Sequence, residues 1–566
     1  MRFLVLVPFV VALAQPPRIR VDTSADRHPI SKLVYGLNEM GDADSSGKDQ
    51  SLLGRMPFTA RRWGGDNSVA YNWKLDADNS AGNWFFETFP KSKLKPAVSD
   101  DLGLPSGTSF EQWLARNQKA GVKAVATVPI IGWTVNSNKA KDCAFSVRKY
   151  GPQKQTDVYA PDCGTGVKTD GKTNIVNDPN DVYMEVGPDF AQEWVATITA
   201  RYGSADKGGV YLWELDNEPT WWHAVHRDIH PQFATFAEVL DRNIRWAKAI
   251  KAADPTALVG GATPPGWESY FYSAADLYAG WSTGPDYKYW NNPRDCKANN
   301  ADGPCDGFLP WYLRKMREQE DQGGVRLVDY LDIHAYVGPD NLPEAYQAAK
   351  PEVEKLRMTS TRIFWDPDYM PVRHDMRGMD RKWGTGTPQI VPRMKKWIAA
   401  NYPGTRLAIT EYNWGALDKI TGAIAQADIL GIFGREGVDL ATIWATVPPT
   451  SPATFAWRMF LDYDGQGSGF GAISVQGATT DVDTVSVFAS ENETGTVTVL
   501  LLNKSLEDIE VPFEAPGLES RPIRVWRYSE ADLKKIVPVD DASWGDDRRA
   551  KLALPALSMT MLVLPN

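Results

Sequence analysis

Two glutamates stand at the ends of stretches that read as buried strands. Residues 210–215 are apolar and aromatic, and they run into the sequence DNEP, in which Pro219 directly follows Glu218. Because proline cannot donate to a β-ladder and disfavours helical geometry in the residue before it, the strand is expected to end there. Residues 406–412 likewise contain an apolar run, and Glu411 stands at its end. One carboxylic acid and one carboxylate are what hydrolysis of a glycosidic bond requires.

A glutamate at the end of a strand more often has a structural role, in a salt bridge or a cap, than a catalytic one. Here two such glutamates occur, and each has an Asn and a Trp close by in the sequence. The carboxyl ends of parallel strands are also where α/β barrels carry their chemistry. Glu218 and Glu411 are therefore the candidate catalytic pair, and a purely structural role for each is the competing interpretation.

The elements that must position this pair follow a regular rhythm of strand, loop and helix. Amphipathic helices are expected at 110–121, 190–202, 233–253 and 392–401. Eight strands are expected, at residues 33–38, 59–65, 122–130, 210–215, 257–263, 328–336, 406–412 and 440–447. This alternation predicts an α/β fold, a (β/α)8 TIM-like barrel with long insertions. A doubly wound sheet is the alternative, but no Gly-rich phosphate fingerprint follows the first strand.

The character of the chain changes near residue 471, where short β-rich runs separated by turn residues replace the helices. These runs are 485–490, 496–503, 509–513, 523–528 and 557–564. They predict a small additional β-sandwich domain, which the early strand at 19–24 could complete. The expected division is therefore a signal peptide at 1–14, an N-terminal strand joining the β-sandwich at 15–32, the catalytic barrel at 33–470 and the C-terminal β-sandwich at 471–566.

Composition limits the class of partner. The chain has 566 residues, with 61 Lys and Arg against 71 Asp and Glu, which gives a net charge of −10. An acidic protein is a poor partner for nucleic acid or an anionic membrane, so we expect neither as a partner. Separately, we expect the protein to be a monomer. The 22 tryptophans are the informative excess, because indole rings stack on the apolar faces of sugars. About half of them are expected to fill the core instead.

The first fourteen residues, MRFLVLVPFVVALA, have one Arg, an apolar run and an Ala-Leu-Ala ending. This pattern predicts a cleaved secretory signal and an extracellular protein, because the run is too short for a membrane span of about 20 residues. An uncleaved anchor is the alternative. Export permits disulfides, and three pairings of four cysteines are possible. The local pairs Cys143–Cys163 and Cys296–Cys305 are the economical choice, and the spacing does not indicate a zinc site.

A carboxylic acid on the fourth strand and a nucleophile on the seventh resemble the layout of a large clan of retaining glycosidases. The finer resemblance is to glycoside hydrolase family 44, extracellular endoglucanases and xyloglucanases, and it covers nearly the whole mature chain. The phrases that carry it are YGLN at 35–38, RRWGG at 61–65, YNW at 71–73, NWFFE at 83–87, ELDNEP at 214–219, HRDIHP at 226–231, DIHAY at 332–336 and TEYNWG at 410–415.

The resemblance implies a role for several residues. Glu218 resembles the family's acid/base, Glu411 its nucleophile, and Asn217 the residue that binds the hydroxyl next to the anomeric carbon. Arg62 would keep Glu411 ionised, because an adjacent cation lowers the pKa of a carboxyl group. Asp66 is a departure, since the family is expected to have Asn after the double glycine, and it could add a charge near one sugar subsite.

The implied function is a secreted retaining endo-β-1,4-glucanase that hydrolyses internal bonds of cellulose derivatives, xyloglucan and mixed-linkage glucan. The alternatives are a non-catalytic glycan-binding protein and a related barrel hydrolase acting on xylan or mannan. The residues expected to bind the polysaccharide are Arg62, Trp73, Trp84, Asn217, Trp222, His334, Tyr336, Trp414 and Trp444.

Neither a cofactor nor a catalytic metal is expected. Three histidines at spacings of three and four, His223, His226 and His230, could make a metal site, but the family resemblance implies histidines here without a catalytic metal. An acidic group could hold a structural calcium, with a solvated acidic loop as the competing interpretation. Its members are Asp178, Asp181 and Glu185.

Overall fold

The computed structural model describes residues 16–283, 293–300, 305–336, 351–371, 387–444 and 447–566. The expected signal peptide at 1–14 and residues 445–446 of the eighth expected strand lie outside this part of the chain. No helix within these ranges is long and apolar enough to cross a bilayer.

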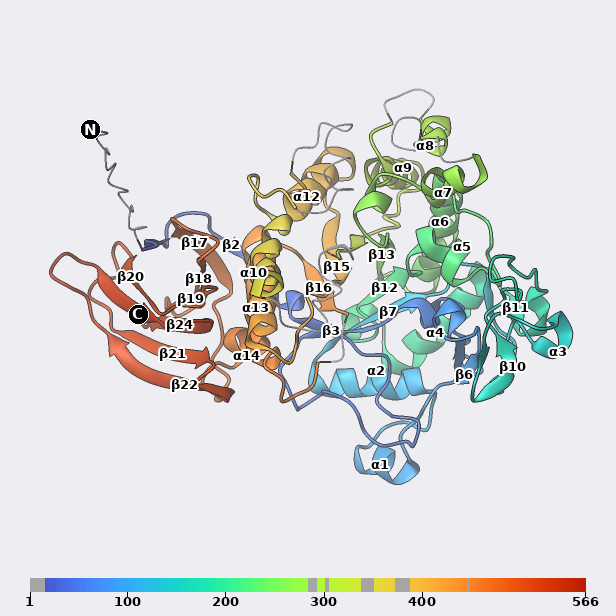
Figure 1. Cartoon of the computed structure of the whole chain (residues 1–566), viewed down its shortest axis with the longest axis horizontal. Helices are drawn as coiled ribbons and strands as arrows, with labels where there is room; N and C mark the ends of the chain where they lie inside the picture. Colours follow the sequence, from blue (N-terminus) through green and yellow to red (C-terminus); the bar gives the residue numbers. More distant parts are fainter. Residues whose placement is uncertain (1–15, 284–292, 301–304, 337–350, 372–386, 445–446) are drawn as a thin grey trace, which may run out of the picture.

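A closed barrel of parallel strands forms the centre of the larger domain (Figure 1). Each strand falls within one of the eight expected ranges, so the barrel prediction is confirmed. All residues of the fourth of these strands are buried, because helices cover the outside of the barrel and side chains fill its inside. In chain order the strands are β3 (Gly36–Asn38), β4 (Ala60–Trp63), β7 (Lys123–Val128), β12 (Leu212–Leu215), β13 (Leu258–Ala262), β14 (Tyr330–His334), β15 (Arg406–Glu411) and β16 (Leu440–Ile443).

Helices surround the barrel, most of them amphipathic. The larger ones are α2 (Ser109–Ala120), α4 (Pro188–Tyr202), α6 (Phe236–Ala253), α9 (Phe308–Gly323), α12 (Ile390–Asn401) and α13 (Ile420–Glu436). The helix α13 is the exception and is buried on all sides between the barrel and the sandwich. The start of α2 shows why the sequence forms a helix there, because Thr108 and Glu111 make a reciprocal capping box. Gly121 then ends this helix in the left-handed conformation that glycine adopts freely. Shorter helices are α1 (Pro96–Asp101), α3 (Val147–Tyr150), α5 (Trp222–Val225), α7 (Ala274–Thr283), α8 (Arg294–Asn299), α10 (Pro351–Thr359) and α14 (Thr454–Leu461).

The smaller domain is one ten-stranded sheet folded over its own apolar core. The N-terminal strand β1 (Ile19–Asp22) lies between β17 and β20, antiparallel to the first and parallel to the second. Strands β17, β22 and β23 were not among the expected runs, because polar and exposed residues dilute their apolar pattern. The later strands are β17 (Ile473–Thr479), β18 (Val485–Glu491), β19 (Val497–Asn503), β20 (Ile509–Glu514), β21 (Ile523–Ser529), β22 (Asp532–Ala542), β23 (Ala550–Leu554) and β24 (Ser558–Leu564).

The two domains share an apolar interface. One continuous core runs from the barrel into the outer face of the sandwich, and α13 and α14 lie between the two domains (Figure 1). Phe455 on α14 stacks on Tyr528 of β21 with ring centroids 4.4 Å apart. Gly431 on α13 leaves the space that the Phe488 ring of β18 occupies. The sandwich is therefore packed against the barrel domain, whereas a flexible tether would leave these side chains exposed.

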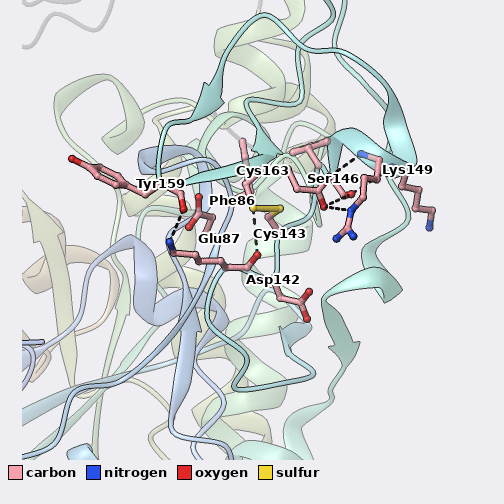
Figure 2. Close-up of a disulfide and its surroundings, with 12 residues drawn as sticks. Phe86, Glu87, Asp142, Cys143, Ser146, Lys149, Tyr159 and Cys163 are labelled. Carbon is pink, nitrogen blue, oxygen red and sulfur yellow. Dashed lines mark hydrogen bonds and ion pairs between the residues drawn. A yellow bond between two sulfur atoms is a disulfide. The ribbon is translucent and has the colours of Figure 1, made fainter.

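Long loops extend from the barrel, and both expected disulfides lie in them. Cys143 pairs with Cys163 and Cys296 with Cys305, which confirms the local pairing. Figure 2 shows the first bridge beside Glu87 and Tyr159, where it ties the segment after β8 (Trp133–Val135) to β10 (Ala160–Gly164). The remaining short strands are β2 (His28–Pro29), β5 (Ala77–Asn79), β6 (Thr88–Pro90), β9 (Thr156–Asp157) and β11 (Tyr183–Glu185).

Candidate active site

Parallel strands bring the candidate residues to one end of the barrel. Glu411 is the last residue of β15, and His334 is the last residue of the neighbouring β14. Asn217 and Glu218 directly follow Asp216, the first residue after β12. Because all carboxyl ends of a parallel barrel face the same way, residues distant in sequence meet there.

A left-handed backbone places Glu218. Its φ is 47° and that of Asp216 is 66°, a conformation that non-glycine residues adopt only when their surroundings hold it. The Asp216 carboxylate accepts hydrogen bonds from the backbone amides of Ile130 and Ile131, at 2.6 and 3.0 Å. The Glu218 amide donates to the Thr263 carbonyl at 3.2 Å. These bonds hold the turn and direct the glutamate across the barrel mouth.

Arg62 on β4 joins the two candidate strand ends. Its side chain is fully buried, and Nη1 donates to Glu411 Oε1 at 2.7 Å. Nη2 donates to Asn217 Oδ1 at 3.0 Å, and Nε donates to Glu214 Oε2 at 2.8 Å. Arg62 was predicted to bind the polysaccharide, but a side chain with no exposed surface cannot do so directly. It positions Glu411 and Asn217 from below.

The two glutamates face each other across His334. The ring Nδ1 of His334 lies 2.7 Å from Glu218 Oε1 and 3.4 Å from Glu411 Oε2. Tyr336 donates its hydroxyl to Glu411 Oε2 at 2.8 Å. One carboxyl oxygen of each glutamate and one ring nitrogen of His334 all lie within 4.8 Å of one another. The two carboxyl groups are therefore close enough to act on the same bond.

The electrostatics separate the two glutamates. Burial and the negative charge of Asp66 raise the pKa of Glu218 to about 8, against the lowering effect of Arg62. Burial also raises the pKa of Glu411, although His334 and Arg62 oppose the rise. The sequence argument counted only the effect of Arg62 and expected a lowered value, so it missed the desolvation of a buried carboxyl group. Glu411 still has a guanidinium and a phenol as donors, which favour its ionised form.

A second layer of buried acids lies beneath the site and was not foreseen. Thr410 Oγ1 lies 2.9 Å from Glu214 Oε1 and 2.7 Å from Asp332 Oδ1. A hydroxyl has a single hydrogen, so one of these two acids must itself carry a proton. Burial and Glu214 raise the pKa of Asp332 well above its usual range, whereas Arg62 helps to hold that of Glu214 at about 2. The sequence signal was one acid within each of two apolar strands, Glu214 in LWEL and Asp332 in YLDIH.

A cavity of about 380 Å³ opens above the pair. Its lining residues are Asp66, Asn217, Glu218, Trp221, Pro265, Tyr336, Glu411 and Trp444. A larger cavity of about 540 Å³ lies between α13 and the sandwich, but its buried acid, Asp428, pairs with Lys504 and accepts a hydrogen bond from Thr361. The smaller cavity contains two adjacent carboxyl groups with a raised pKa and is the better candidate for chemistry.

Two glycines allow this cavity to form. A side chain on Gly64 would collide with the guanidinium of Arg62, and one on Gly65 would collide with the Trp444 ring. Gly65 also has a φ of 98°, which side chains disfavour. The chain can therefore turn sharply after β4 and present Asp66 at the cavity wall.

The predicted aromatic residues divide into two groups. Trp84 is 45% exposed and Trp444 is 36% exposed, as expected of residues that contact a polysaccharide. Trp222 and Trp414 are buried, so their prediction as cleft residues was wrong. Their indole N–H groups explain this, because Trp222 donates to Asp216 Oδ1 and Trp414 donates to Ser360 Oγ.

The other predicted binding residues also differ in position. Trp73 is half-buried, and its Nε1 donates to the Phe190 carbonyl at 3.3 Å. Asn217 and Tyr336 line the cavity, whereas His334 is buried beneath it. Trp221, the neighbour of Trp222, is 38% exposed and lines the cavity.

The candidate metal ligands mostly have other partners. His230 Nε2 lies 2.8 Å from Glu238 Oε1, and Lys149 pairs with Asp181. Within the described residues, the one group of three potential ligands is Glu218, His334 and Glu411. The Arg62 guanidinium already supplies a positive charge to that group, so an acid/base role explains it without an ion.

Comparison with known proteins gives consistent results. The family model described as glycoside hydrolase family 44 matches residues 77–338. The crystal structure of CelM2, a bifunctional glucanase-xylanase from a metagenome library, is 34% identical with a TM-score of 0.84, over 97% of this chain and 99% of that one. A Paenibacillus polymyxa xyloglucanase from glycoside hydrolase family 44 is 26% identical with a TM-score of 0.73, over 98% and 100% of the two chains.

Among curated proteins, Endoglucanase A of Paenibacillus lautus is 28% identical over 571 residues. The similarity spans 98% of this chain and 73% of that protein. Both domains of the chain are therefore part of the similarity.

Proposed function

Because the chain belongs to glycoside hydrolase family 44, and is thus a glycoside hydrolase, we propose that it is a secreted retaining endo-β-1,4-glucanase. The observation that carries the mechanistic part is the closeness of Glu218 and Glu411. One carboxyl oxygen of Glu218 lies within 4.8 Å of one carboxyl oxygen of Glu411. Retaining glycosidases hold their two carboxyl groups about 5–5.5 Å apart, whereas inverting enzymes leave a wider gap for water. This spacing supports double displacement.

In the first step, Glu411 attacks the anomeric carbon and forms a glycosyl ester. Glu218 gives its proton to the glycosidic oxygen, so the leaving sugar departs as a neutral alcohol. Arg62 and Tyr336 hold the two oxygens of Glu411 in place before the attack. The raised pKa of Glu218, about 8, keeps this group protonated near neutral pH.

In the second step, the ester has removed the negative charge of Glu411. The pKa of Glu218 then falls, because a neighbouring negative charge had favoured its protonated form. Glu218 takes a proton from a water molecule, and the water oxygen attacks the anomeric carbon on the face that the first alcohol left. The ester bond between this carbon and Glu411 breaks, and Glu411 leaves as a carboxylate. Two inversions at one carbon give net retention.

The reaction course can be tested by following the first products with NMR. Retention predicts that the β-anomer appears first and then mutarotates. An α-anomer as the initial product would contradict the assignment of Glu411 as nucleophile. Glu218→Gln should abolish nearly all activity on a polymer while the melting temperature stays close to that of the wild type. A folded but active Glu218→Gln variant would show that another group is the acid.

The proposed substrates are β-1,4-glucans: xyloglucan, cellulose derivatives and mixed-linkage glucan. The similarity to a xyloglucanase and an endoglucanase supports this class. A related structure described as a glucanase-xylanase makes xylan the second candidate. A panel of defined polysaccharides, scored by released reducing ends, separates these cases. A folded protein that binds glucan and releases none would instead be a glycan-binding protein.

Internal cleavage and secretion are the remaining parts of the proposal. Exposed Trp221 and Trp444 line the cavity, and exposed Trp84 directly follows Asn83, which donates to Asp66; these residues support a groove with subsites on both sides of the glutamates. Viscosity of a soluble glucan should then fall steeply while few reducing ends form. Early accumulation of one short product would contradict internal cleavage. For secretion, the mature N-terminus in the culture medium should lie near residue 15.

A further inference from the structure

Asp66 has two hydrogen-bond partners at the cavity wall. Its Oδ1 accepts from Asn217 Nδ2 at 2.8 Å, and its Oδ2 accepts from Asn83 Nδ2 at 2.8 Å. Both donors are neutral amides. Within the described residues, no Lys or Arg forms an ion pair with Asp66, so its charge is not neutralised locally. The nearby His226 does not neutralise it either, because burial lowers the pKa of that ring to about 4.

The Asn217 amide is held from both sides. Arg62 donates to its oxygen at 3.0 Å, and Asp66 accepts from its nitrogen at 2.8 Å. A guanidinium only donates and a carboxylate only accepts, so these two partners allow a single orientation of the amide. Asp66 therefore determines which atoms of Asn217 remain available to a sugar hydroxyl.

Charged and titratable groups surround Glu218 from several elements. Arg62 approaches from β4, Glu214 from β12, and His334 and Glu411 from β14 and β15. Asp66 adds a further negative charge from the turn after β4. After burial, this charge is the largest of the effects that raise the pKa of Glu218.

We propose that Asp66 is a positioning residue for hydrolysis: it orients Asn217 toward the sugar hydroxyl and holds a fixed negative charge beside Glu218. The inference rests on the proposed function, in which Asn217 binds the hydroxyl next to the anomeric carbon and Glu218 is the acid. It adds a residue that acts through both of them.

Two substitutions separate charge from orientation. Asp66→Asn removes the charge but keeps an oxygen that can accept from Asn217, and Asn83 can rotate its amide to match. Asp66→Ala removes the charge and both hydrogen bonds. The matched control is Asp100→Asn, the same chemical change at an exposed residue of α1 that is not part of the site.

The first readout is the dependence of kcat/KM on pH. In Asp66→Asn the alkaline limb should move to lower pH by about one unit, because loss of a nearby negative charge makes Glu218 easier to ionise. Asp100→Asn should keep the wild-type profile. A merely structural role of Asp66 would lower activity by the same factor at every pH, and an unchanged limb in a folded Asp66→Asn variant overturns the charge part.

The second readout compares kcat/KM for two substrates. One is an aryl β-glucoside chain, and the other is the same chain without the 2-hydroxyl group on the reacting sugar. The wild type should lose much of its kcat/KM with the deoxy substrate. In Asp66→Ala this loss should shrink at least tenfold, because Asn217 is no longer held, whereas Asp66→Asn should keep most of it. Equal losses in all three proteins overturn the orientation part.

A third readout does not depend on turnover. The carboxyl carbon of Glu218, labelled with ¹³C and assigned through Glu218→Gln, should titrate at lower pH in Asp66→Asn than in the wild type. If the wild type cleaves no polysaccharide, the proposed function fails, yet this titration still decides the charge part. If the wild type is active and the titration is unchanged, the charge part fails while the function stands.

Discussion

Each nitrogen of Arg62 serves a different group of the site. Nε donates to Glu214, Nη1 to Asn38 and Glu411, and Nη2 to Asn217. Lysine has a single nitrogen on a flexible stem and cannot make these bonds at once. The planar fork of the arginine therefore holds the nucleophile and the neighbouring amide in a fixed relation.

Arg62→Lys should lower kcat at least 100-fold, because Glu411 loses its fixed donor. A cost of about 3 kcal/mol in unfolding free energy is also expected for a disrupted buried ion pair. The measurements are kcat on soluble glucan and denaturant unfolding. Arg61→Lys is the matched control, since Arg61 is equally buried but pairs with Glu39 and Asp42. It should lose stability while the folded fraction keeps its kcat, and similar kcat losses in both variants would contradict a specific role of Arg62.

The pKa directions predict a bell-shaped pH profile. Rising pH removes the proton from Glu218, so activity should fall as pH passes about 8. Falling pH protonates Glu411, whose pKa burial raises above the usual range of a glutamate, so the acid limb should lie at a higher pH than an ordinary glutamate would give. A substrate with an activated phenol as leaving group needs little acid assistance. Its alkaline limb should therefore be weaker, and an identical limb for both substrates would argue against Glu218 as the acid.

The exposed tryptophans should act on binding rather than on folding. Trp84→Ala and Trp444→Ala are expected to weaken polysaccharide binding by roughly 1–2 kcal/mol with little change in melting temperature. Trp222→Ala is the control, because this ring is buried and its loss should cost about 3–5 kcal/mol of stability. Titration calorimetry with an oligosaccharide and thermal unfolding separate the two effects. A large stability loss in Trp84→Ala would contradict the surface role.

Tryptophan shows where residue-level prediction from the sequence ends. Trp222 follows Glu218 by four residues and Trp414 follows Glu411 by three, yet both are buried. The cause is a local polar partner for each indole, Asp216 and Ser360, which only the folded loops bring within reach. In contrast, Glu218 and Glu411 were identifiable because a carboxylate after an apolar strand needs a specific reason to be there.

At the scale of elements, most of the eight barrel strands were predictable because they are short apolar runs bounded by polar or turn residues. The strand β4, with the sequence ARRW, is an exception. The sandwich strand β22 was not predictable, since six of its eleven residues are charged or proline in the sequence DLKKIVPVDDA. Such a strand is stabilised by its pairing with β21 and not by its own burial. Pairing of this kind involves residues outside the segment, so a pattern within the segment cannot reveal it.

The disulfide between Cys143 and Cys163 should stabilise the loop that it closes. The sequence separation is 20 residues for this bridge and 9 for Cys296–Cys305. Chain-entropy arguments give roughly 3 kcal/mol for the first and slightly less for the second. Replacing each pair by serines and measuring unfolding free energy tests this order. A larger loss for the shorter loop would show that native contacts, and not loop length, determine the effect.

At the scale of the whole molecule, the close contact between α13 and the sandwich makes Gly431 sensitive to substitution. A methyl group there would collide with the Phe488 ring, so Gly431→Ala should destabilise the protein by about 1–3 kcal/mol. Gly434→Ala on the same helix is the control, because its new methyl group would lie 3.2 Å from the Cγ2 methyl group of Ile30, a close contact that a small shift relieves, whereas the Phe488 ring would lie only 2.4 Å from a methyl group on Gly431. It should be tolerated, and calorimetry of both variants measures the difference. Equal melting temperatures would contradict tight docking of the two domains.

The position of β1 has a consequence for protein synthesis. The Arg18 amide donates to Thr480, a partner 462 residues further along the chain. At roughly 5–20 residues per second, a ribosome needs about 20–90 s to reach that partner. Throughout this time β1 has no neighbouring strand, because β17 and β20 have not yet been synthesised. All barrel strands are made before β17. The barrel can thus close before the sandwich exists, and β17 and β20, which are made after the barrel strands, bring the first strand into its sheet.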